Sequence, residues 1–335
     1  MVLEFILGVL YFLIVTIGIR SYISFATMRN ITAKTNFRTL HKNETPKGGG
    51  IIIFLSIFIA LILLSNLYPI SRELKYGFFA GGSIISIYGF IDDIIDIQRY
   101  KKFFALSLFS LMPLLIYGVP QIEIINLPKF LIFLSSWFLI LWFLNAYNFI
   151  DGIDGLASSV GIFIFLSIFL INLLFGQFST IGMVSLLIIL SCSAFLVFNF
   201  PPARIFMGDS GSLFLGYSVI IFLFETIQLN LIDIWTWLIL LSFIMGETTT
   251  TSILRIFLTK KWYGAHRSHA YQNLARILDS HRYVLFAIVL YHILWLLPLA
   301  LLSMEYHNYK VLIFSFAIIP VIFLNLIYGP KFSSK

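Results

Sequence analysis

Apolar stretches long enough to cross a lipid bilayer recur along almost the whole chain, from Val2 to Tyr328. A membrane span needs about 20 mostly apolar residues, and it must be helical because lipid offers no water to satisfy backbone polar groups. Of the 335 residues, 60% are hydrophobic and 11% are charged, whereas soluble domains have roughly 25% charged residues. This pattern excludes a soluble globular protein, a disordered chain and a nucleic-acid-binding protein. It predicts a single all-α integral membrane domain over residues 1–335.

Eleven stretches of the sequence meet the requirement for a transmembrane helix. The ninth contains a polar run from Glu247 to Thr251, which indicates that this span could be broken and that the count could be ten. The predicted spans are Val2–Ile19, Gly48–Leu64, Leu74–Ile91, Phe103–Val119, Phe130–Phe149, Leu156–Phe175, Thr180–Phe200, Leu213–Leu229, Trp235–Phe257, Tyr283–Ser303 and Val311–Tyr328.

The distribution of Lys and Arg predicts how these spans are oriented. If the N-terminus is outside, the inner segments hold 18 of the 22 basic residues. Basic residues collect on the cytoplasmic side of membrane proteins. We therefore expect a protein of the cytoplasmic (inner) membrane with its N-terminus outside and its C-terminus in the cytoplasm. The same bias explains the net charge of +7.

Polar motifs occur at the membrane edge in five places, and the predicted topology puts all five on the cytoplasmic face. Taken singly, a loop carboxylate is usually a solvated charge and a loop glycine is usually a turn. Their convergence on one face predicts a binding or active site. The only cysteine, Cys192, lies inside an apolar run, so neither an intrachain disulfide nor a cysteine metal cluster is possible.

The first motif is Thr45–Gly50, which contains Lys47 and follows Lys42. Three glycines let a backbone approach a ligand closely, and the two lysines suit a phosphate as flexible point charges. The alternative is an ordinary turn before a helix, with lysines that follow the positive-inside rule.

The second motif is Asp92 and Asp93, followed by Asp96, at the end of the third predicted span. Carboxylates among apolar residues at a membrane edge are costly unless they are paired or used. Asp92 and Asp96 share a helical face if the helix continues, while Asp93 points elsewhere. The alternative is a set of ordinary anions before the basic stretch 99–102.

The third motif has Asn145, Asn148, Asp151 and Asp154 at steps of three residues. A continuing helix would place these four oxygen-bearing side chains along one stripe. Oxygen ligands are what a hard divalent cation takes. The glycines of this segment indicate that the helix ends here and that the last carboxylates lie in a loop.

The last two motifs are a glycine and serine turn at 206–212 and a histidine loop at 263–272. In the turn, Asp209 opens a helix, where it could hold a metal beside an anion or be a plain N-cap. In the loop, His266 and His269 have a spacing that could bind zinc, but no cysteine and no further close histidine supports that. Together with Arg267 they are better matched to phosphate oxygens or a sugar.

These motifs, in this order, resemble the polyprenyl-phosphate N-acetylhexosamine-1-phosphate transferases of glycosyltransferase family 4. That family includes the enzyme that makes lipid I of peptidoglycan and the enzymes that start O-antigen, enterobacterial common antigen and teichoic acid linkage units. The resemblance rests on Asp92 with Asp93, on Asn145–Gly155, on Phe206–Ser212 and on the histidine loop.

The resemblance implies that a sugar 1-phosphate passes from a UDP-N-acetylhexosamine to undecaprenyl phosphate at the cytoplasmic face, with Mg²⁺ (or Mn²⁺) and with release of UMP. It also implies a multi-pass membrane fold, contact with membrane lipid and a homodimer. The expected site residues are catalytic Asp92, Asp93, Asp151 and His266; substrate-binding Lys42, Lys47, Asn145, Asp154, Arg267 and His269; and metal-binding Asp209 and Asn148.

The loop His266–Gln272 lacks the run of adjacent histidines that marks the peptidoglycan enzyme. We therefore expect an enzyme that starts O-antigen or another surface polysaccharide. The alternatives are the phospho-N-acetylmuramoyl-pentapeptide transferase of peptidoglycan synthesis and, in a different class, a polytopic transporter. Asp96, Glu225 and Glu247 receive no role from the resemblance, and we interpret both glutamates as structural, with Glu247 able to pair with a neighbouring helix.

Overall fold

A computed structural model describes residues 2–33, 44–120, 128–175, 179–259, 264 and 266–330. Within these residues, 10 helical segments are long and apolar enough to cross a membrane, and a bent helix pair brings the number to 11. The predicted all-α membrane fold is confirmed. The only sheet in the described part of the chain is a two-stranded antiparallel pair, in which Thr32 lies opposite Pro46 and Ala33 opposite Thr45.

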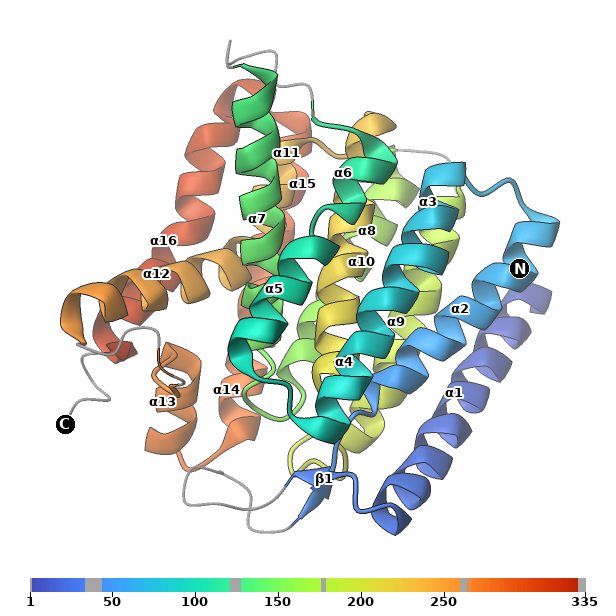
Figure 1. The fold of residues 1–335 in the computed structure, drawn as a ribbon. Helices are drawn as coiled ribbons and strands as arrows, with labels where there is room; N and C mark the ends of the chain where they lie inside the picture. The colour runs from blue at the N-terminus through green and yellow to red at the C-terminus, as the bar shows by residue number, and fades with distance from the viewer. Residues whose placement is uncertain are drawn as a thin grey trace.

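Two spans, Arg72–Ile95 and His281–Glu305, contain a π-helical turn between two helical segments. Figure 1 shows the arrangement of the helices. The first half of the described chain contains α1 (Val2–Met28), β1 (Thr32–Ala33), β2 (Thr45–Pro46), α2 (Gly50–Leu67), α3 (Arg72–Tyr76), η1 (Gly77–Gly82), α4 (Ser83–Ile95), α5 (Arg99–Phe109), α6 (Met112–Tyr117), α7 (Lys129–Phe149) and α8 (Leu156–Phe175).

The second half continues with helices that pack around and beside the first group (Figure 1). Its elements are α9 (Thr180–Asn199), α10 (Asp209–Gln228), α11 (Ile234–Leu240), α12 (Ser242–Leu258), α13 (Ala270–Ile277), α14 (His281–Tyr291), η2 (His292–Leu296), α15 (Leu297–Glu305), η3 (His307–Tyr309) and α16 (Lys310–Tyr328).

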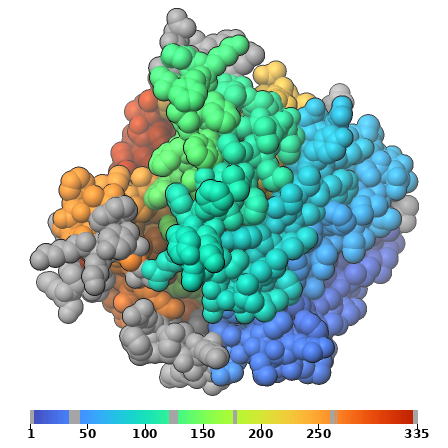
Figure 2. Space-filling view, in the orientation of Figure 1, coloured from blue at the N-terminus to red at the C-terminus, as the bar shows by residue number. Residues whose placement is uncertain are grey.

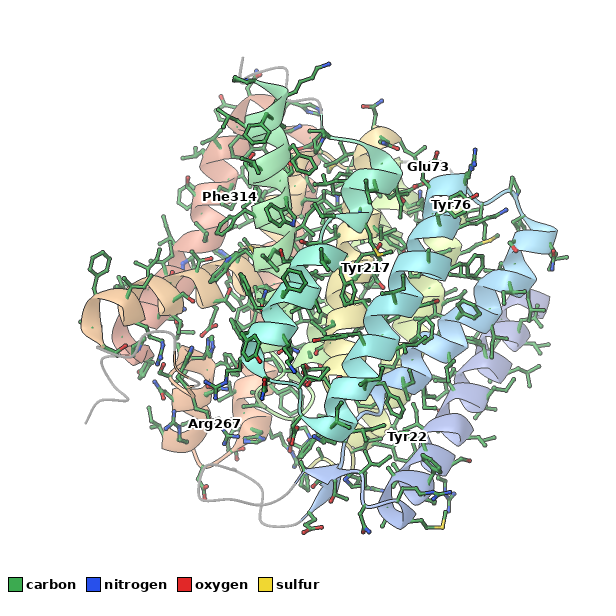
Figure 3. The ribbon with its side chains drawn as sticks, viewed as in Figure 1. Tyr22, Glu73, Tyr76, Tyr217, Arg267 and Phe314 are labelled. Carbon is green, nitrogen blue, oxygen red and sulfur yellow. The ribbon has the colours of Figure 1, made fainter. Side chains whose placement is uncertain are left out.

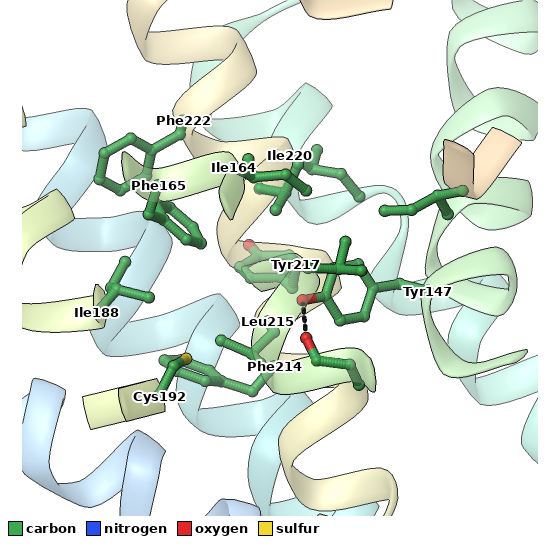
Figure 4. Packing of buried hydrophobic residues seen from close by; sticks show 14 of the residues in the cluster. Tyr147, Ile164, Phe165, Ile188, Cys192, Phe214, Leu215, Tyr217, Ile220 and Phe222 are labelled. Atoms are coloured by element: carbon green, nitrogen blue, oxygen red, sulfur yellow. Dashed lines mark hydrogen bonds between the residues drawn. The ribbon is translucent and has the colours of Figure 1, made fainter. Parts of the chain in front are cut away.

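Helix α10 is the centre of the bundle, and 89% of its span is buried. Small residues let its neighbours come close: a Cβ on Gly50 of α2 would lie 2.1 Å from the Cα of Gly211. Larger side chains fill the space further along, as Figure 4 shows for Tyr147, Tyr217 and the residues around them. The Tyr147 hydroxyl is fully buried among them and donates to the Ala157 carbonyl at 3.0 Å. A helix that is apolar on all sides is expected in such a central position.

The segment before α10 is held by the chain that leads into α2. The Gly49 and Gly50 amides donate to the Phe206 and Met207 carbonyls at 3.1 and 2.9 Å, and the Phe206 amide donates to Pro46 at 2.8 Å. The first and fourth sequence motifs are therefore hydrogen-bonded to each other. This places the N-terminus of α10 beside the N-terminus of α2.

The ninth predicted span is broken, but at Leu241, before the polar run, which lies within the continuous helix α12. Helices α11 and α12 meet at an angle of 70°, so α12 runs across the bundle beside α7 and α16 instead of along it (Figure 1). Its outer face carries Ile253, Ile256 and Phe257, which are all exposed. An apolar helix that projects in this way is suited to contact with lipid.

The outer surface of the bundle is strongly apolar. In Figure 2 the side chains of α4 to α7 form the face in front of α10. Large exposed hydrophobic residues on this face include Phe103, Phe104, Phe130 and Phe138. Because a water-soluble protein rarely exposes so large a contiguous apolar surface, this face belongs in a membrane.

Candidate functional site

The five motifs come together at one end of the bundle. At this end α4, α7 and α9 finish and α2, α8 and α10 begin; we call it the site end. In Figure 3 the labelled Tyr22 and Arg267 lie at the site end, and Glu73 and Tyr76 lie at the opposite end. The Tyr22 hydroxyl donates to the Lys47 carbonyl at 2.9 Å, which ties the first motif to α1. The convergence predicted from the topology is present.

Asp92 and Asp209 share one cation, the Lys102 ammonium. Lys102 lies 3.0 Å from the Asp92 carboxylate and also contacts that of Asp209. The other Asp92 oxygen accepts from the Ile97 amide at 2.6 Å. The two carboxylates are therefore close enough together to bind a single cation. Helix α5 supplies this lysine because the chain turns back after α4.

Asn148 lies beside this acidic pair. Its amide nitrogen donates to the second Asp209 oxygen at 2.8 Å and to the Ser212 hydroxyl at 3.0 Å. The amide oxygen of Asn148 is on the same side-chain group, so a flip of the amide would present it to a cation. The predicted metal residues Asn148 and Asp209 are therefore neighbours, and Asp92 joins them through Lys102.

Asp93 has a different environment from Asp92. Its carboxylate accepts from the Asp209 and Ser210 amides at 3.0 and 3.1 Å, so it caps the N-terminus of α10, where free amides favour a negative charge. Gly208 makes this approach possible: a Cβ there would lie 2.4 Å from an Asp93 oxygen. Asp93 thus positions the backbone that carries Asp209.

The donor set at the site end fits a magnesium ion. Magnesium is usually held by one or two carboxylates, with substrate phosphates and water completing its shell. Asp92 and Asp209 supply two carboxylates that already reach a shared cation, and Asn148 adds an amide. Among the described residues, no three Asp, Glu, His or Cys side chains form a metal cluster by themselves. Water and substrate phosphates would complete the shell of a divalent ion held here.

The loop between α7 and α8 carries two further carboxylates. Asp154 accepts from the Ala203 amide at 3.0 Å, and its carboxylate lies 3.3 Å from the His281 imidazole. Burial, and then the charges of Asp93 and Asp154, raise the pKa of Asp151 well above its ordinary value. The direction of this shift favours the protonated form of Asp151.

The histidine loop is anchored to α12 by an arginine. Arg255 donates to the Gly264 carbonyl at 3.2 Å and to the Ser268 hydroxyl at 3.3 Å. That hydroxyl lies 3.1 Å from the Nδ1 of His266. Burial, followed by the charges of His269 and Arg255, lowers the pKa of His266 to about 3. His266 is therefore a neutral imidazole near pH 7.

His269 is held by a buried carboxylate that the sequence motifs do not contain. Its Nδ1 lies 2.7 Å from Glu247 of α12, and both side chains are buried. The second Glu247 oxygen accepts from the Ala270 amide at 3.0 Å. Glu247 therefore joins the loop to α12 and caps the start of α13.

The remaining predicted residues are placed as follows. The Lys47 ammonium donates to Asp96 at 3.2 Å, and Asp96 is mostly exposed. The Asn145 amide donates to the Leu141 carbonyl at 2.7 Å within its own helix, and Arg267 lies in the histidine loop. Lys42 lies outside the described residues.

Many of the described site residues line a cavity of about 1070 Å³. One part of its wall is polar, and another part, formed by α5, α7 and α12, is apolar. The polar part includes Lys47, Lys102, Asn145, Asn148, Asp151, Asp154, His266, Arg267 and His269, and the apolar part includes Phe103, Phe138, Leu139, Trp142, Met245, Ile253 and Ile256. Phe138 and Ile256 are also exposed on the outer surface, so the apolar wall continues onto the face that contacts lipid.

Comparison with known proteins places the chain in a family. Residues 76–227 match the model of glycosyl transferase family 4. A probable undecaprenyl-phosphate N-acetylglucosaminyl 1-phosphate transferase of Bacillus subtilis (strain 168) is 32% identical over 261 residues, which are 73% of this chain and 70% of that protein. The chain belongs to glycosyl transferase family 4.

Two other relatives show the range of the family. A phospho-N-acetylmuramoyl-pentapeptide-transferase of Streptococcus pyogenes serotype M5 is 30% identical over 80% of this chain and 85% of that protein. A decaprenyl-phosphate N-acetylglucosaminephosphotransferase of Mycolicibacterium smegmatis is 32% identical over 53% of this chain and 49% of that protein. The family-4 match contains the second, third and fourth motifs, while the histidine loop follows it in the sequence.

Sequence reasoning missed four residues at the site of this family-4 protein: Lys102, Glu247, Arg255 and His281. Lys102 could have been found, because a turn after Asp96 brings the residue ten positions after Asp92 back towards it. Glu247 and His281 contact residues 22 and 127 positions away, and Arg255 contacts residues 9 and 13 positions away. These contacts depend on the direction of α12 after its bend and on the packing of α14, which the sequence does not show.

Proposed function

We propose that the chain transfers an N-acetylhexosamine 1-phosphate from a UDP-sugar to undecaprenyl phosphate, releases UMP and thereby starts a surface polysaccharide. The observation that carries this proposal is the two-sided cavity. Its polar wall is suited to a nucleotide sugar, and its apolar wall leads to the lipid-facing surface between α7 and α12. A soluble substrate and a lipid substrate can meet only at such a boundary. The names of the relatives support the same pair of substrates.

The site residues have different roles in this reaction, and each role follows from the surroundings of the residue. Lys102 and Lys47 supply positive charge that offsets the repulsion between a lipid phosphate and a diphosphate. Asp92 stands next to Lys102 and is placed to orient or deprotonate the lipid phosphate, whose oxygen attacks the β-phosphorus. The bond from that phosphorus to the bridging oxygen then breaks, and UMP leaves. A magnesium ion held by Asp92, Asp209 and Asn148 would supply further charge neutralisation for the leaving phosphate.

Asp93 acts on this reaction indirectly, since both its oxygens are used by the N-terminus of α10. Asp154, held by Ala203 and His281, is placed to receive the nucleoside. Arg267 and His269 line the cavity from the opposite loop and are suited to the phosphates or the sugar. The site end faces the cytoplasm in this proposal, because UDP-sugars are made there.

A direct assay tests the proposal. Purified protein in detergent receives undecaprenyl phosphate, MgCl₂ and each of a panel of UDP-sugars, including UDP-N-acetylmuramoyl-pentapeptide. UMP release that requires both the lipid and the metal supports the transferase, and the active sugar separates surface-polysaccharide initiation from the peptidoglycan reaction. No UMP release with any sugar would support a transporter instead.

One variant tests the metal site within this assay. Asp209→Ala removes a carboxylate that contacts the shared cation, so magnesium-dependent UMP release should fall at least 100-fold, the order expected when transition-state charge stabilisation is lost. Asp233→Ala is the control, because Asp233 caps α11 at the opposite end. Normal activity of Asp209→Ala would remove Asp209 from the metal site.

A further inference from the structure

Glu247 is a buried carboxylate that the proposed reaction does not use. Its side chain is 0% exposed, in a helix of otherwise mostly uncharged residues. A buried carboxylate is costly unless charge or hydrogen bonds compensate it. Both oxygens of Glu247 are engaged with the histidine loop, one with His269 and one with the Ala270 amide. The Thr251 hydroxyl of the same helix adds a longer contact to one of these oxygens at 3.4 Å. The two shorter contacts of Glu247 are therefore both with the segment 269–270.

The bend before α12 makes this contact possible. Glu247 lies less than two turns after the bend and Arg255 two turns further along the same helix. Arg255 fixes the first part of the loop at Gly264 and Ser268, and Glu247 fixes its end at His269. Thr251 lies between them and donates to Asn325 of α16 at 2.8 Å, which holds α12 in place. The loop is therefore attached at two points to one helix.

The contact with Glu247 determines which nitrogen of His269 can meet a ligand. An ionised Glu247 only accepts hydrogen bonds, so its contact at 2.7 Å assigns a proton to Nδ1 of His269. Nε2 is then the ring nitrogen left for a ligand. The His266 ring stacks on one side at 5.0 Å and the Tyr271 ring lies at 5.6 Å, so the plane of the imidazole is fixed as well. His269 lines the cavity.

Among the residues that the structure describes, no carboxylate pairs with His266. Its Nδ1 faces the Ser268 hydroxyl, which Arg255 already contacts. A hydroxyl can donate or accept, so it does not stabilise an imidazolium as a carboxylate does. The two histidines of the motif are therefore chemically different, although the sequence presents them as equivalent.

We propose that Glu247 is a positioning residue that accepts from the Nδ1–H of His269 and balances the charge of the doubly protonated ring, so that its Nε2–H donates to a phosphate oxygen of the nucleotide sugar. His269, and not His266, is then the phosphate-binding imidazole of this loop. The inference rests on the proposed function for its ligand, but the arrangement of Glu247 and His269 does not depend on it. The charged and titratable groups around His269 are Glu247 and Arg255 of α12, His266 of the loop and Tyr271 of α13.

The arrangement of the pair is tested without any substrate. The protein is labelled with ¹⁵N-histidine, and the His269 signal is assigned by its loss in His269→Gln. We expect the signature of a protonated Nδ1 in the wild type and its loss or redistribution between the two nitrogens in Glu247→Gln. Glu225→Gln is the matched control, since Glu225 is also a buried carboxylate, bonded to Tyr117 at 2.8 Å in another part of the bundle. An unchanged His269 signal in Glu247→Gln would overturn the proposal.

The ligand is tested by the binding of UDP and uridine in the presence of MgCl₂. Glu247→Gln and His269→Gln should each weaken the binding of UDP about tenfold and leave that of uridine unchanged, because only UDP has phosphates. Glu225→Gln should stay within about threefold of the wild type for both, and His266→Gln should weaken the binding of UDP less than His269→Gln does. A merely structural role for Glu247 would weaken both ligands equally.

The possible results distinguish a failure of this inference from a failure of the proposed function. If the wild type binds UDP and Glu247→Gln binds it equally well, the inference fails and the proposed function stands. If His266→Gln loses UDP binding and His269→Gln keeps it, the roles of the two histidines are reversed and the inference again fails. If the wild type binds neither UDP nor uridine, the proposed function fails, and with it the ligand assigned to His269.

Discussion

At the scale of single residues, the chemistry of the site depends on partners that differ between apparently similar side chains. Asp92 and Asp93 are adjacent, yet one contacts the Lys102 ammonium and the other caps α10. The spacing of the two aspartates predicted that they point in different directions, and the structure supplies their partners. Lys102 is the residue on which the acidic pair depends most directly.

Replacing Lys102 with methionine should destabilise the protein in the absence of divalent ions. Asp92 and Asp209 would then repel each other, at a cost of about 1–3 kcal/mol for the lost charge-assisted contacts. Added MgCl₂ can take the place of the ammonium, so it should raise the thermal unfolding temperature more in Lys102→Met than in the wild type.

Thermal unfolding in detergent, with EDTA or with MgCl₂, measures this effect. Lys101→Met is the control, because Lys101 is exposed and lies 6.0 Å from the Tyr100 ring. Equal responses of the two variants to MgCl₂ would show that the position between Asp92 and Asp209 does not attract a divalent ion.

At the scale of elements, the N-terminus of α10 is built by close backbone approaches. Gly208 has a φ of +72°, a conformation that is strained for any other residue. It also leaves room for the Asp93 carboxylate. The sequence shows that this segment is a glycine turn. It does not show that the turn leaves space for Asp93, because that aspartate lies 115 residues earlier in the chain.

Gly208→Ala should therefore lower the free energy of unfolding by more than backbone strain alone would. We expect about 1–3 kcal/mol from the backbone and about 1 kcal/mol more from the displaced cap, together with loss of transferase activity. Gly118→Ala is a close control, since Gly118 has a φ of +81° and nothing within 4 Å of the added Cβ. Unfolding by denaturant and UMP release measure both effects, and equal losses in the two variants would contradict the role of Asp93.

The ninth span shows which features of the fold could be predicted from the sequence and which could not. The polar run from Glu247 to Thr251 indicated an interrupted helix, and the bend lies just before it, between Leu240 and Ser242. The direction of α12 after the bend could not be predicted, because it depends on packing against α7 and α16. The pairing of Glu247 with His269 follows from that direction, which is why Glu247 was interpreted as a structural residue.

At the scale of the whole molecule, the membrane fold and the gathering of the motifs were predictable, since both follow from where apolar runs begin and end. The orientation in the membrane rests on the excess of Lys and Arg at the site end. Cys192 is the only cysteine of the sequence and is buried. Once it is replaced by alanine, a thiol reagent reacts only with a cysteine introduced at one end of the bundle.

We expect Leu229→Cys, at the far end of α10, to react with an impermeant maleimide added to intact cells, and Gln98→Cys, at the site end, to react only after the membrane is opened. Both positions are exposed. Labelling of Gln98→Cys in intact cells would reverse the predicted topology and place the site outside the cytoplasm.

The most direct test of the whole account follows the phosphorus atom. The UDP-sugar that is active in the panel is prepared with ³²P at the β-phosphate and incubated with the protein, MgCl₂ and undecaprenyl phosphate. Sugar 1-phosphate transfer predicts that the label moves with the sugar into the lipid phase while unlabelled UMP remains in water. Label that stays in the water as UDP, with or without transfer of the sugar, would contradict the account.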